Sequence, residues 1–337
     1  MLNIALIGCG RIGRMHADLI DRHPQSRLTA VYDPVPAAAK AIAESIQTQV
    51  AATPEVIFNN DNVDAIVVAS VTSTHADFIE QAVEAGKPVL CEKPIDLDID
   101  RVRACRNKIA GSNVPVQIGF NRRFDPGHAQ MKSAISAGDI GNLVQVLITS
   151  RDPEPPSDEY LTGAGGMLRD MTIHDFDLAR FLLDDDEPVE VFAYAAPLID
   201  PARGARLNEV DCAMIVMKSS NGRQVFINNA RQAPYGYDQR LEAHGDGGMV
   251  QSTNRTPHGM QTFTAAGTGT AAPLEPFFIE RYTHAFKHQL DSFVSAVLNK
   301  TQPEVGFDDG MRALLLAEAA YVSLEKGCAV KVAPVED

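Results

Sequence analysis

Three glycines near the start of the chain have the spacing of a phosphate-binding turn. The string Gly8-Cys-Gly10-Arg-Ile-Gly13 follows an apolar run at residues 3–7 and opens a stretch with helical spacing. In that context the first glycine permits a tight turn, the second lets the main chain approach a pyrophosphate, and the third lets helix and strand pack closely. The N-terminus of the helix also offers N–H groups and a partial positive charge to phosphates. The residues predicted to bind a dinucleotide here are Gly8, Gly10, Arg11, Ile12 and Gly13.

An aspartate after the next apolar run adds to this prediction. Asp33 lies 20 residues beyond Gly13, directly after the run at residues 28–32. A carboxylate in that position bonds the adenosine ribose hydroxyls and repels a 2′-phosphate. The following residue is Pro34, not an arginine, so the sequence favours NAD over NADP. The alternative is an ordinary glycine turn with a surface aspartate.

A lysine follows another apolar run in a position suited to catalysis. Glu92-Lys93-Pro94 comes directly after residues 88–91. In an open α/β sheet the carboxyl ends of the strands face the ligand crevice, and Pro94 keeps the preceding residue out of the α region. A lysine beside a nicotinamide can polarise a hydroxyl or the carbonyl formed from it. The alternative is a strand-exit turn with a solvated lysine.

Two aspartates and a histidine form the second candidate cluster. On a helix, Asp170, His174 and Asp177 share one face, because they are spaced i, i+4 and i+7. Carboxylates that flank an imidazole raise its basicity and fix its orientation, as a general base requires. The alternatives are a solvated helix face and a metal site. The H-E-x-x-H pattern is absent, so no metal is predicted.

The elements that must position these groups fall into two patterns. Up to about residue 122, short Val/Ile/Leu runs alternate with helical stretches, which predicts an α/β domain with a parallel sheet. Beyond it, longer alternating runs and an Asn-Gly turn at residues 221–222 predict an α+β domain with a large, open, mostly antiparallel sheet. We therefore expect a Rossmann domain at residues 1–122 and a second domain at residues 123–337, with a C-terminal helix that packs back toward the first.

Two further segments carry structural expectations. Residues 251–276 are rich in Thr, Gly, Ala and Pro and are predicted to form a loop. The acidic run Asp184-Asp185-Asp186-Glu187 is predicted to form a solvated turn.

Composition excludes several classes of function. With 30 Lys and Arg against 44 Asp and Glu, the 337-residue chain carries a formal charge of −14, which disfavours nucleic acid or an anionic membrane as partner. No apolar run approaches the roughly 20 residues that span a bilayer, and the N-terminus lacks the basic region of a signal peptide. Five scattered cysteines without a C-x-x-C pair indicate a reducing compartment, so a cytoplasmic location is expected.

Taken together, the motifs resemble a known family. The glycine turn, the stretches at residues 72–75 and 85–88, Glu92-Lys93-Pro94 and Asp170…His174 are similar to the glucose–fructose oxidoreductase / inositol dehydrogenase / rhizopine catabolism family over essentially the whole chain. Residues 119–126, 150–153, 169–177 and 235–240 resemble its inositol dehydrogenase branch.

This resemblance implies a function and a set of roles. It implies NAD-dependent oxidation of a cyclitol hydroxyl to a ketone, with myo-inositol converted to 2-keto-myo-inositol in inositol catabolism, and a homotetramer that packs through the open sheet. His174 takes the proton of the reacting hydroxyl, while Lys93 and Asp170 hold and polarise it. The further cofactor residues are Ser70, His75, Glu92 and Lys93. The substrate residues are Lys93, Arg123, Asp152, Asp170, His174, Asp177 and one or both of Tyr235 and Tyr237.

Alternatives remain open within this resemblance. A sugar or deoxysugar dehydrogenase of the same family could use the same Lys, Asp and His, and an NAD-binding regulator without activity would use only the nucleotide end. Inositol-specific members often carry His or Asn before the proline that corresponds to Pro153, where this chain has Ser150 and Asp152. The preferred polyol is therefore left open.

Overall fold

The glycine turn follows the first strand of a parallel sheet. This computed structural model describes residues 1–184 and 186–335. The N-terminal elements are β1 (Leu2–Ile7), α1 (Arg11–Arg22), β2 (Ser26–Tyr32), α2 (Pro36–Ile46), β3 (Gln49–Val50), α3 (Pro54–Phe58), β4 (Ala65–Val68), the 3-10 helix η1 (Thr72–Thr74), α4 (His75–Glu84), β5 (Val89–Cys91), α5 (Ile99–Ile109) and β6 (Val116–Ile118). The six strands pair in the order β3-β2-β1-β4-β5-β6, all parallel, which is the doubly wound dinucleotide-binding order. The Rossmann prediction is confirmed.

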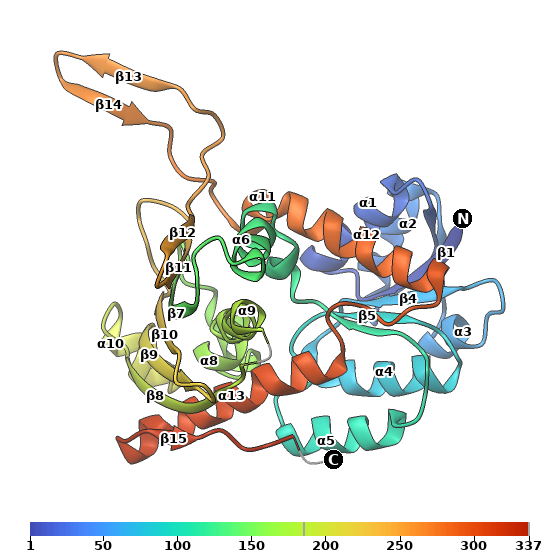
Figure 1. Ribbon diagram of the computed structural model, residues 1–337. Helices are drawn as coiled ribbons and strands as arrows, with labels where there is room; N and C mark the ends of the chain where they lie inside the picture. The colour runs from blue at the N-terminus through green and yellow to red at the C-terminus, as the bar shows by residue number, and fades with distance from the viewer. Residues whose placement is uncertain (185, 336–337) are drawn as a thin grey trace. The chain divides into compact units, whose positions relative to one another are not determined.

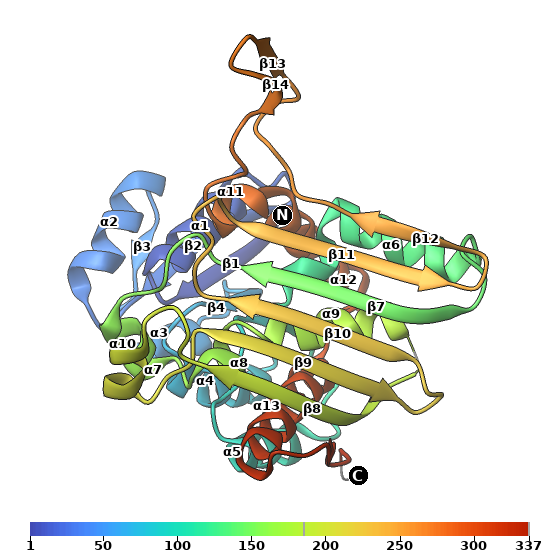
Figure 2. The ribbon, with the colours of Figure 1, turned by 90° about the vertical axis from the view of Figure 1, so that its left-hand side faces the viewer.

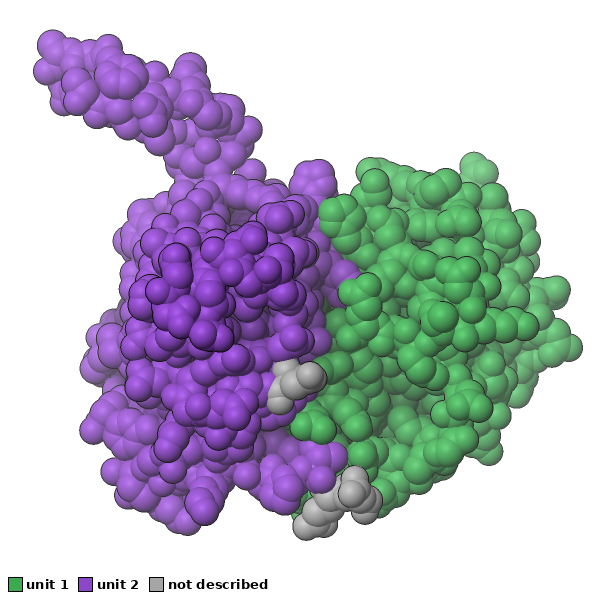
Figure 3. Space-filling view, viewed as in Figure 1, with its two compact units in different colours: residues 1–120, 287–314 green, residues 121–286, 315–337 purple. Residues whose placement is uncertain are grey.

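The unit built on this sheet is discontinuous in sequence. It comprises residues 1–120 and 287–314, coloured green in Figure 3. Its hydrophobic core joins the strands and α1 to Leu290, Phe293 and Val294 of helix α12 (Thr283–Asn299), which lies in part in this unit. The side-chain amide of Gln117 on β6 donates to the carbonyl of Gln289 over 3.1 Å. The late segment is therefore part of the core of this unit.

The second unit comprises residues 121–286 and 315–337 and contains a larger sheet. Its elements are the 3-10 helix η2 (Asn121–Phe124), α6 (Pro126–Ala137), β7 (Leu143–Arg151), α7 (Asp158–Gly163), α8 (Met167–Asp170), α9 (Ile173–Leu183), β8 (Pro188–Ala196), α10 (Pro201–Leu207), β9 (Cys212–Ser219), β10 (Gln224–Ala230), β11 (Asp238–Gly245), β12 (Gly248–Ser252), β13 (Gln261–Thr264), β14 (Gly267–Ala271), α11 (Phe278–Arg281) and β15 (Val330–Lys331), together with parts of α12 and of α13 (Phe307–Lys326).

Seven strands of this unit pair in the order β12-β11-β7-β10-β9-β8-β15. All neighbours are antiparallel except β7 and β10, which run parallel. Helices such as α6 and α9 lie against one face, and Figure 2 looks onto the other. The prediction of an α+β unit with a mostly antiparallel, open sheet is confirmed.

Local sequence explains where the helices of this unit begin. Asp125 caps α6, because its carboxylate accepts the N–H of Gly127 over 2.9 Å, and Pro126 occupies the first helical position. Asp200 and Pro201 repeat the arrangement at α10. Such caps satisfy N–H groups that the helix itself leaves unpaired.

Residues 251–276 do not form a plain loop. β12 ends at Ser252, and β13 and β14 pair as an antiparallel hairpin whose residues are all exposed. The hairpin projects from the rest of its unit in both ribbon views (Figures 1 and 2). The loop prediction is wrong because Thr and Gly gave no alternating apolar signal, whereas pairing between the two strands needs none.

The acidic run is also not a solvated turn throughout. Asp186 is only 3 % exposed, and its carboxylate accepts the hydroxyls of Ser219 and Ser220 and the N–H of Asn221. It therefore braces the turn between β9 and β10. Asp185 lies outside the described residues.

Candidate active site

The glycine turn is shaped by backbone packing at two of its three glycines. Gly8 has φ +97°, and a side chain on it would collide with the main chain of Ala69 and Ser70, after β4. A side chain on Gly13 would collide with the carbonyl of Gly8. These glycines are needed for the turn itself, because no side chain fits between the packed backbones.

Gly10 differs from the other two. It is the N-cap of α1, and a Cβ at this position would meet nothing within 4 Å. No side chain caps this helix, so the N–H groups of its first turn are available to a ligand. An open cradle of main-chain donors at a helix N-terminus fits the pyrophosphate of NAD. Arg11 and Ile12 form that first turn.

Asp33 lies against this turn. It follows β2, and its carboxylate accepts the N–H of Cys9 over 2.7 Å and that of Val35 over 2.8 Å. Both oxygens are thereby fixed beside the glycine turn, where a carboxylate bonds ribose hydroxyls and repels a 2′-phosphate. The geometry suits NAD.

His75 and Ser70 connect two loops at the same edge of the sheet. His75 is 2 % exposed, with Nδ1 2.8 Å from the carbonyl of Pro94 and Nε2 3.1 Å from that of Ser70. Burial lowers the pKa of its imidazole. With both nitrogens against main-chain carbonyls, the ring ties the loop after β4 to the turn after β5.

Glu92 and Lys93 begin that turn after β5. Nε2 of His16, on α1, lies 2.7 Å from a carboxylate oxygen of Glu92. Lys93 is half-buried, and the Lys93–Pro94 peptide is cis. Two contacts hold this turn in place, one from Glu92 to His16 on α1 and one from the carbonyl of Pro94 to His75, and Lys93 lies between them.

In the second unit, Asp170 lies in a buried charged cluster. One of its oxygens accepts the hydroxyl of Tyr160, on α7, over 2.7 Å. Its other oxygen is 2.9 Å from Nη2 of Arg231, and Nη1 of the same arginine is 3.6 Å from Asp152. Burial raises the pKa of Asp152 to about 6, and the charge of Asp170 adds to this while Arg231 opposes it. The Asp170 carboxylate is therefore held by two short contacts, and the Asp152 carboxylate by a longer one.

Asp170 and His174 do not share one continuous helix. Asp170 ends α8, and Met171 and Thr172 separate it from α9, in whose first turn His174 lies half-buried. The hydroxyl of Thr172 donates to Asn229 on β10 over 2.6 Å, a tertiary bond at the break between the helices. The single-helix expectation is wrong.

Asp177 is paired with Arg123 and does not face solvent. Asp177 is fully buried, and its two oxygens accept Nε and Nη2 of Arg123 over 2.8 and 2.5 Å. Two parallel bonds between a guanidinium and a carboxylate fix both planes. The two predicted substrate residues are therefore a single rigid pair that joins η2 to α9.

The two candidate tyrosines differ in environment. Tyr235 is 52 % exposed, and its hydroxyl donates to Asp238 and accepts from Arg151, each over 2.8 Å. Tyr237 is 4 % exposed and packs edge-on against the ring of Tyr282. Burial raises the pKa of Tyr237 well above its ordinary value. Of the two, Tyr237 has the buried position that a specificity residue needs.

Sequence reasoning missed two groups. Arg231 and Tyr160 hold Asp170, and a buried pair of Arg122 and Asp175, 2.8 Å apart, lies beneath β7 and β10 with Asn229. The sequence signal that could have found Arg231 is the string Asn229-Ala230-Arg231, in which a charged residue directly follows an alternating apolar run.

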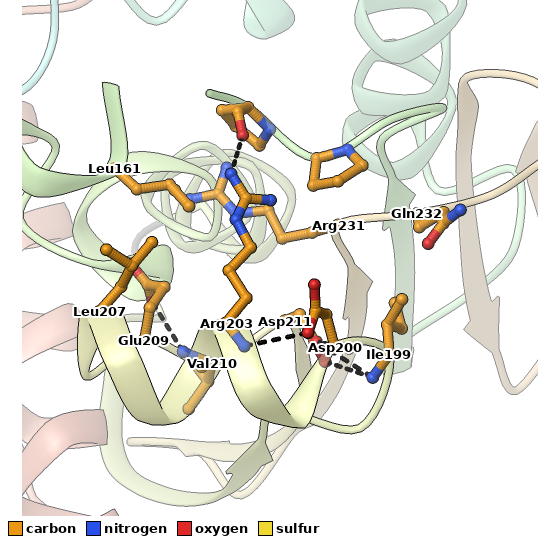
Figure 4. A pocket seen from close by; sticks show the side chains of 13 residues that line it. Leu161, Ile199, Asp200, Arg203, Leu207, Glu209, Val210, Asp211, Arg231 and Gln232 are labelled. Atoms are coloured by element: carbon orange, nitrogen blue, oxygen red, sulfur yellow. Dashed lines mark hydrogen bonds between the residues drawn. The ribbon is translucent and has the colours of Figure 1, made fainter. Parts of the chain in front are cut away.

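A pocket of about 220 Å³ adjoins this cluster (Figure 4). Its wall includes Pro155, Pro156, Leu161, Arg203 and Arg231. Arg203 donates to Asp158 over 2.7 Å and to the carbonyl of Pro156. Arg231 thus lies between the pocket and the two aspartates.

None of the helices in residues 1–184 and 186–335 is long and apolar enough to cross a membrane.

Comparison with known proteins agrees with this architecture. Residues 2–120 match the model of an oxidoreductase family with an NAD-binding Rossmann fold, and residues 128–251 match the GFO/IDH/MocA C-terminal domain. Inositol 2-dehydrogenase of Rhizobium meliloti is 43 % identical over 332 residues, which cover 98 % of this chain and 99 % of that protein.

Two solved structures are similar over nearly the full length. A myo-inositol dehydrogenase of Corynebacterium glutamicum superposes with a TM-score of 0.95 at 42 % identity, covering 99 % of this chain and 100 % of that one. A scyllo-inositol dehydrogenase of Lactobacillus casei, solved with NAD(H) and scyllo-inositol, superposes with a TM-score of 0.92 at 27 % identity and the same coverage. The chain therefore belongs to the GFO/IDH/MocA family of NAD-dependent oxidoreductases.

Proposed function

We propose that this protein oxidises a cyclitol hydroxyl to a ketone with NAD, and that its substrate is myo-inositol, converted to 2-keto-myo-inositol in inositol catabolism. The observation that carries the proposal is the buried cluster in which Arg231 and Tyr160 hold Asp170, four residues before His174. Relatives that match this chain over nearly its full length are named inositol dehydrogenases. In this proposal residues 1–122, together with residues 287–314 of the same unit, form the NAD-binding domain, and the second unit serves substrate binding and oligomerisation. The sequence-based boundary, which left all residues after 122 to the second domain, missed the late segment.

Lys93, Asp170 and His174 form the proposed catalytic set. His174 takes the proton from the reacting hydroxyl, as an imidazole acting as general base does. Lys93 and Asp170 hold the hydroxyl oxygen, so that the developing alkoxide stays hydrogen-bonded. NAD supplies the hydride acceptor and is held by the main-chain donors at Gly10 and by the residues predicted to bind it.

The proposed substrate residues form a polar frame. Arg123 and Asp177 offer a pre-paired guanidinium and carboxylate, Asp152 offers a carboxyl group, and Tyr237 a buried hydroxyl. A frame of this kind rejects a polyol with one hydroxyl inverted, because each buried polar group left unpaired costs roughly 1–3 kcal/mol.

We also infer a homotetramer that packs through the open sheet face. On that face Leu147, Phe226, Val216 and Phe192 are consecutive cross-strand partners on β7, β10, β9 and β8. Leu147 and Val216 are 37 % and 48 % exposed. A contiguous apolar row supports self-association. Light scattering on the wild type and on Val216→Lys tests it, since a monomer in both would refute it. A cytoplasmic location suits the five free cysteines.

The experiment that tests the function is a reduction assay. The purified protein is offered NAD or NADP with myo-, scyllo- and D-chiro-inositol and a panel of aldoses, and NADH formation is followed. We expect turnover of myo-inositol with NAD. Aldose turnover alone would identify a sugar dehydrogenase, and tight NAD binding with no turnover would favour a regulator.

Variants assign the roles in the same assay. We expect Lys93→Ala and His174→Ala to lower kcat at least 100-fold. Lys40→Ala and His258→Ala are the controls, because both side chains are exposed, and they should retain wild-type rates. Normal turnover by either catalytic variant would refute the mechanism.

A further inference from the structure

Arg231 occupies an unusual position for an arginine. It directly follows β10, its main-chain N–H donates to the carbonyl of Asp211 over 2.8 Å, and the residue is 4 % exposed. Its guanidinium contacts two carboxylates, Asp170 at 2.9 Å and Asp152 at 3.6 Å. One buried cation therefore serves two acids.

The two acids are not held equally. Asp170 has the shorter contact with Arg231 and also accepts the hydroxyl of Tyr160, both of which favour its ionised form. Asp152 has the longer contact with Arg231, and burial raises its pKa to about 6. Asp152 is therefore the less firmly held carboxylate of the two.

The burial of these charges does not by itself indicate a stabilising role. Buried ion pairs are often replaced by apolar residues without loss of stability, so their presence is weak evidence for a stabilising role. Nε and Nη2 of Arg231 are both buried and have no hydrogen-bond partner within residues 1–184 and 186–335, so Nη2 meets Asp170 as an ion pair rather than as an aligned hydrogen bond. We therefore look for the role of this buried guanidinium in its effect on Asp170 and Asp152.

We propose that Arg231 is a positioning residue for the oxidation: its guanidinium, which Asp170 and Asp152 share, sets the place and orientation of the Asp170 carboxylate. The inference rests on the proposed function of this site. Other charged or titratable groups that act on the cluster include Arg122, Tyr160, Glu209 and Tyr237.

The adjoining pocket makes the proposal testable by chemical rescue. Arg231→Ala leaves a space beside a cavity of about 220 Å³, which a guanidinium ion can enter. We expect kcat to fall about 100-fold and the acid limb of the kcat/KM pH profile to move upward by about one pH unit, because loss of a cation raises carboxylate pKa values. Guanidinium at tens of millimolar should restore at least a tenth of the lost rate. Urea, a neutral molecule of the same shape, should restore none.

Matched variants separate charge from structure. Arg203→Ala removes an arginine from the wall of the same pocket that pairs with Asp158, and it should keep the wild-type pH profile. Arg231→Lys, which retains the charge, should keep the acid limb nearer to the wild-type position than Arg231→Gln. These two variants decide the matter if Arg231→Ala does not fold.

The outcomes distinguish the two proposals. A wild-type protein that turns over no polyol would overturn the proposed function. An active wild type whose Arg231 variants retain its pH profile, or are rescued equally by urea, or are not rescued at all, would overturn the role of Arg231 alone.

Discussion

Alanine substitutions at Gly10 and Gly13 should have opposite effects: the first weakens cofactor binding, and the second lowers the stability of the fold. Gly10 has φ −69° and ψ −162°, which alanine adopts without strain, and its Cβ position is open. Gly10→Ala should therefore change the free energy of unfolding by no more than about 0.5 kcal/mol. With NAD held by the main-chain donors of this turn as proposed, the same methyl group would stand in the way of the pyrophosphate. Loss of one charge-assisted hydrogen bond, about 1.5–3 kcal/mol, raises the Kd for NAD roughly 10- to 150-fold.

Gly13→Ala should do the reverse. Its Cβ collides with the carbonyl of Gly8, and Gly8 cannot retreat because it is itself packed against Ala69 and Ser70. Forcing an extra carbon into packed backbone costs about 1–3 kcal/mol, of which the better helix propensity of alanine returns up to about 1 kcal/mol. The net loss should appear as a lower urea midpoint at an unchanged m-value.

Urea unfolding and a fluorescence titration with NADH measure the two effects separately. Gly306→Ala is the control, because it is another position in the same unit where an added Cβ would meet no atom within 4 Å, and it should change neither quantity. If Gly10→Ala bound the cofactor as tightly as the wild type, or lost as much stability as Gly13→Ala, the account of the turn would be refuted.

Three further outcomes are expected. Asp33→Ala should reduce the ratio of kcat/KM for NAD to that for NADP at least 10-fold, because the carboxylate that repels a 2′-phosphate is gone, and an unchanged ratio would contradict the ribose contact. Asp186→Ala should lower the free energy of unfolding by about 3 kcal/mol, because the donors of Ser219, Ser220 and Asn221 lose their buried acceptor. A loss below about 1 kcal/mol in urea unfolding would count against a structural role of this carboxylate. Burial lowers the pKa of His128 from 6.5 to about 4, so the unfolded state binds the proton first and stability should fall by about 3 kcal/mol as pH drops from 6.5 to 4. In His128→Gln that part of the acid sensitivity should vanish, and its persistence would assign it to other groups.

The first sheet could be predicted because its signals are local. Each strand is a short apolar run, each is followed by a helical stretch, and the glycine turn lies in the one context that gives it meaning. Asp33 could be predicted for the same reason, because α1 and β2 account for the residues between Gly13 and Asp33, and this spacing can be read from the sequence.

The interior of the second unit could not be predicted in the same way. Asp170 meets Tyr160, which is near in sequence, but also Arg231, which follows β10 far along the chain. The same arginine reaches Asp152 because β10 pairs with β7. Spacing along one helix suggested instead that Asp177 flanks the histidine, whereas a distant arginine, Arg123, binds it. Charged pairs between elements depend on strand order, which a single sequence does not reveal.

The discontinuous first unit has a consequence for the order in which the protein can form. Leu290, Phe293 and Val294 belong to the same core as β1 and α1, and the N–H of Ile118 bonds the carbonyl of Val305. A ribosome delivers these residues only after every strand of the large sheet except β15 has been synthesised. The nucleotide-binding unit must therefore wait, with part of its core uncovered, until residues 287–314 have been made, and a fragment cut at residue 120 would lack the helical residues that complete this core.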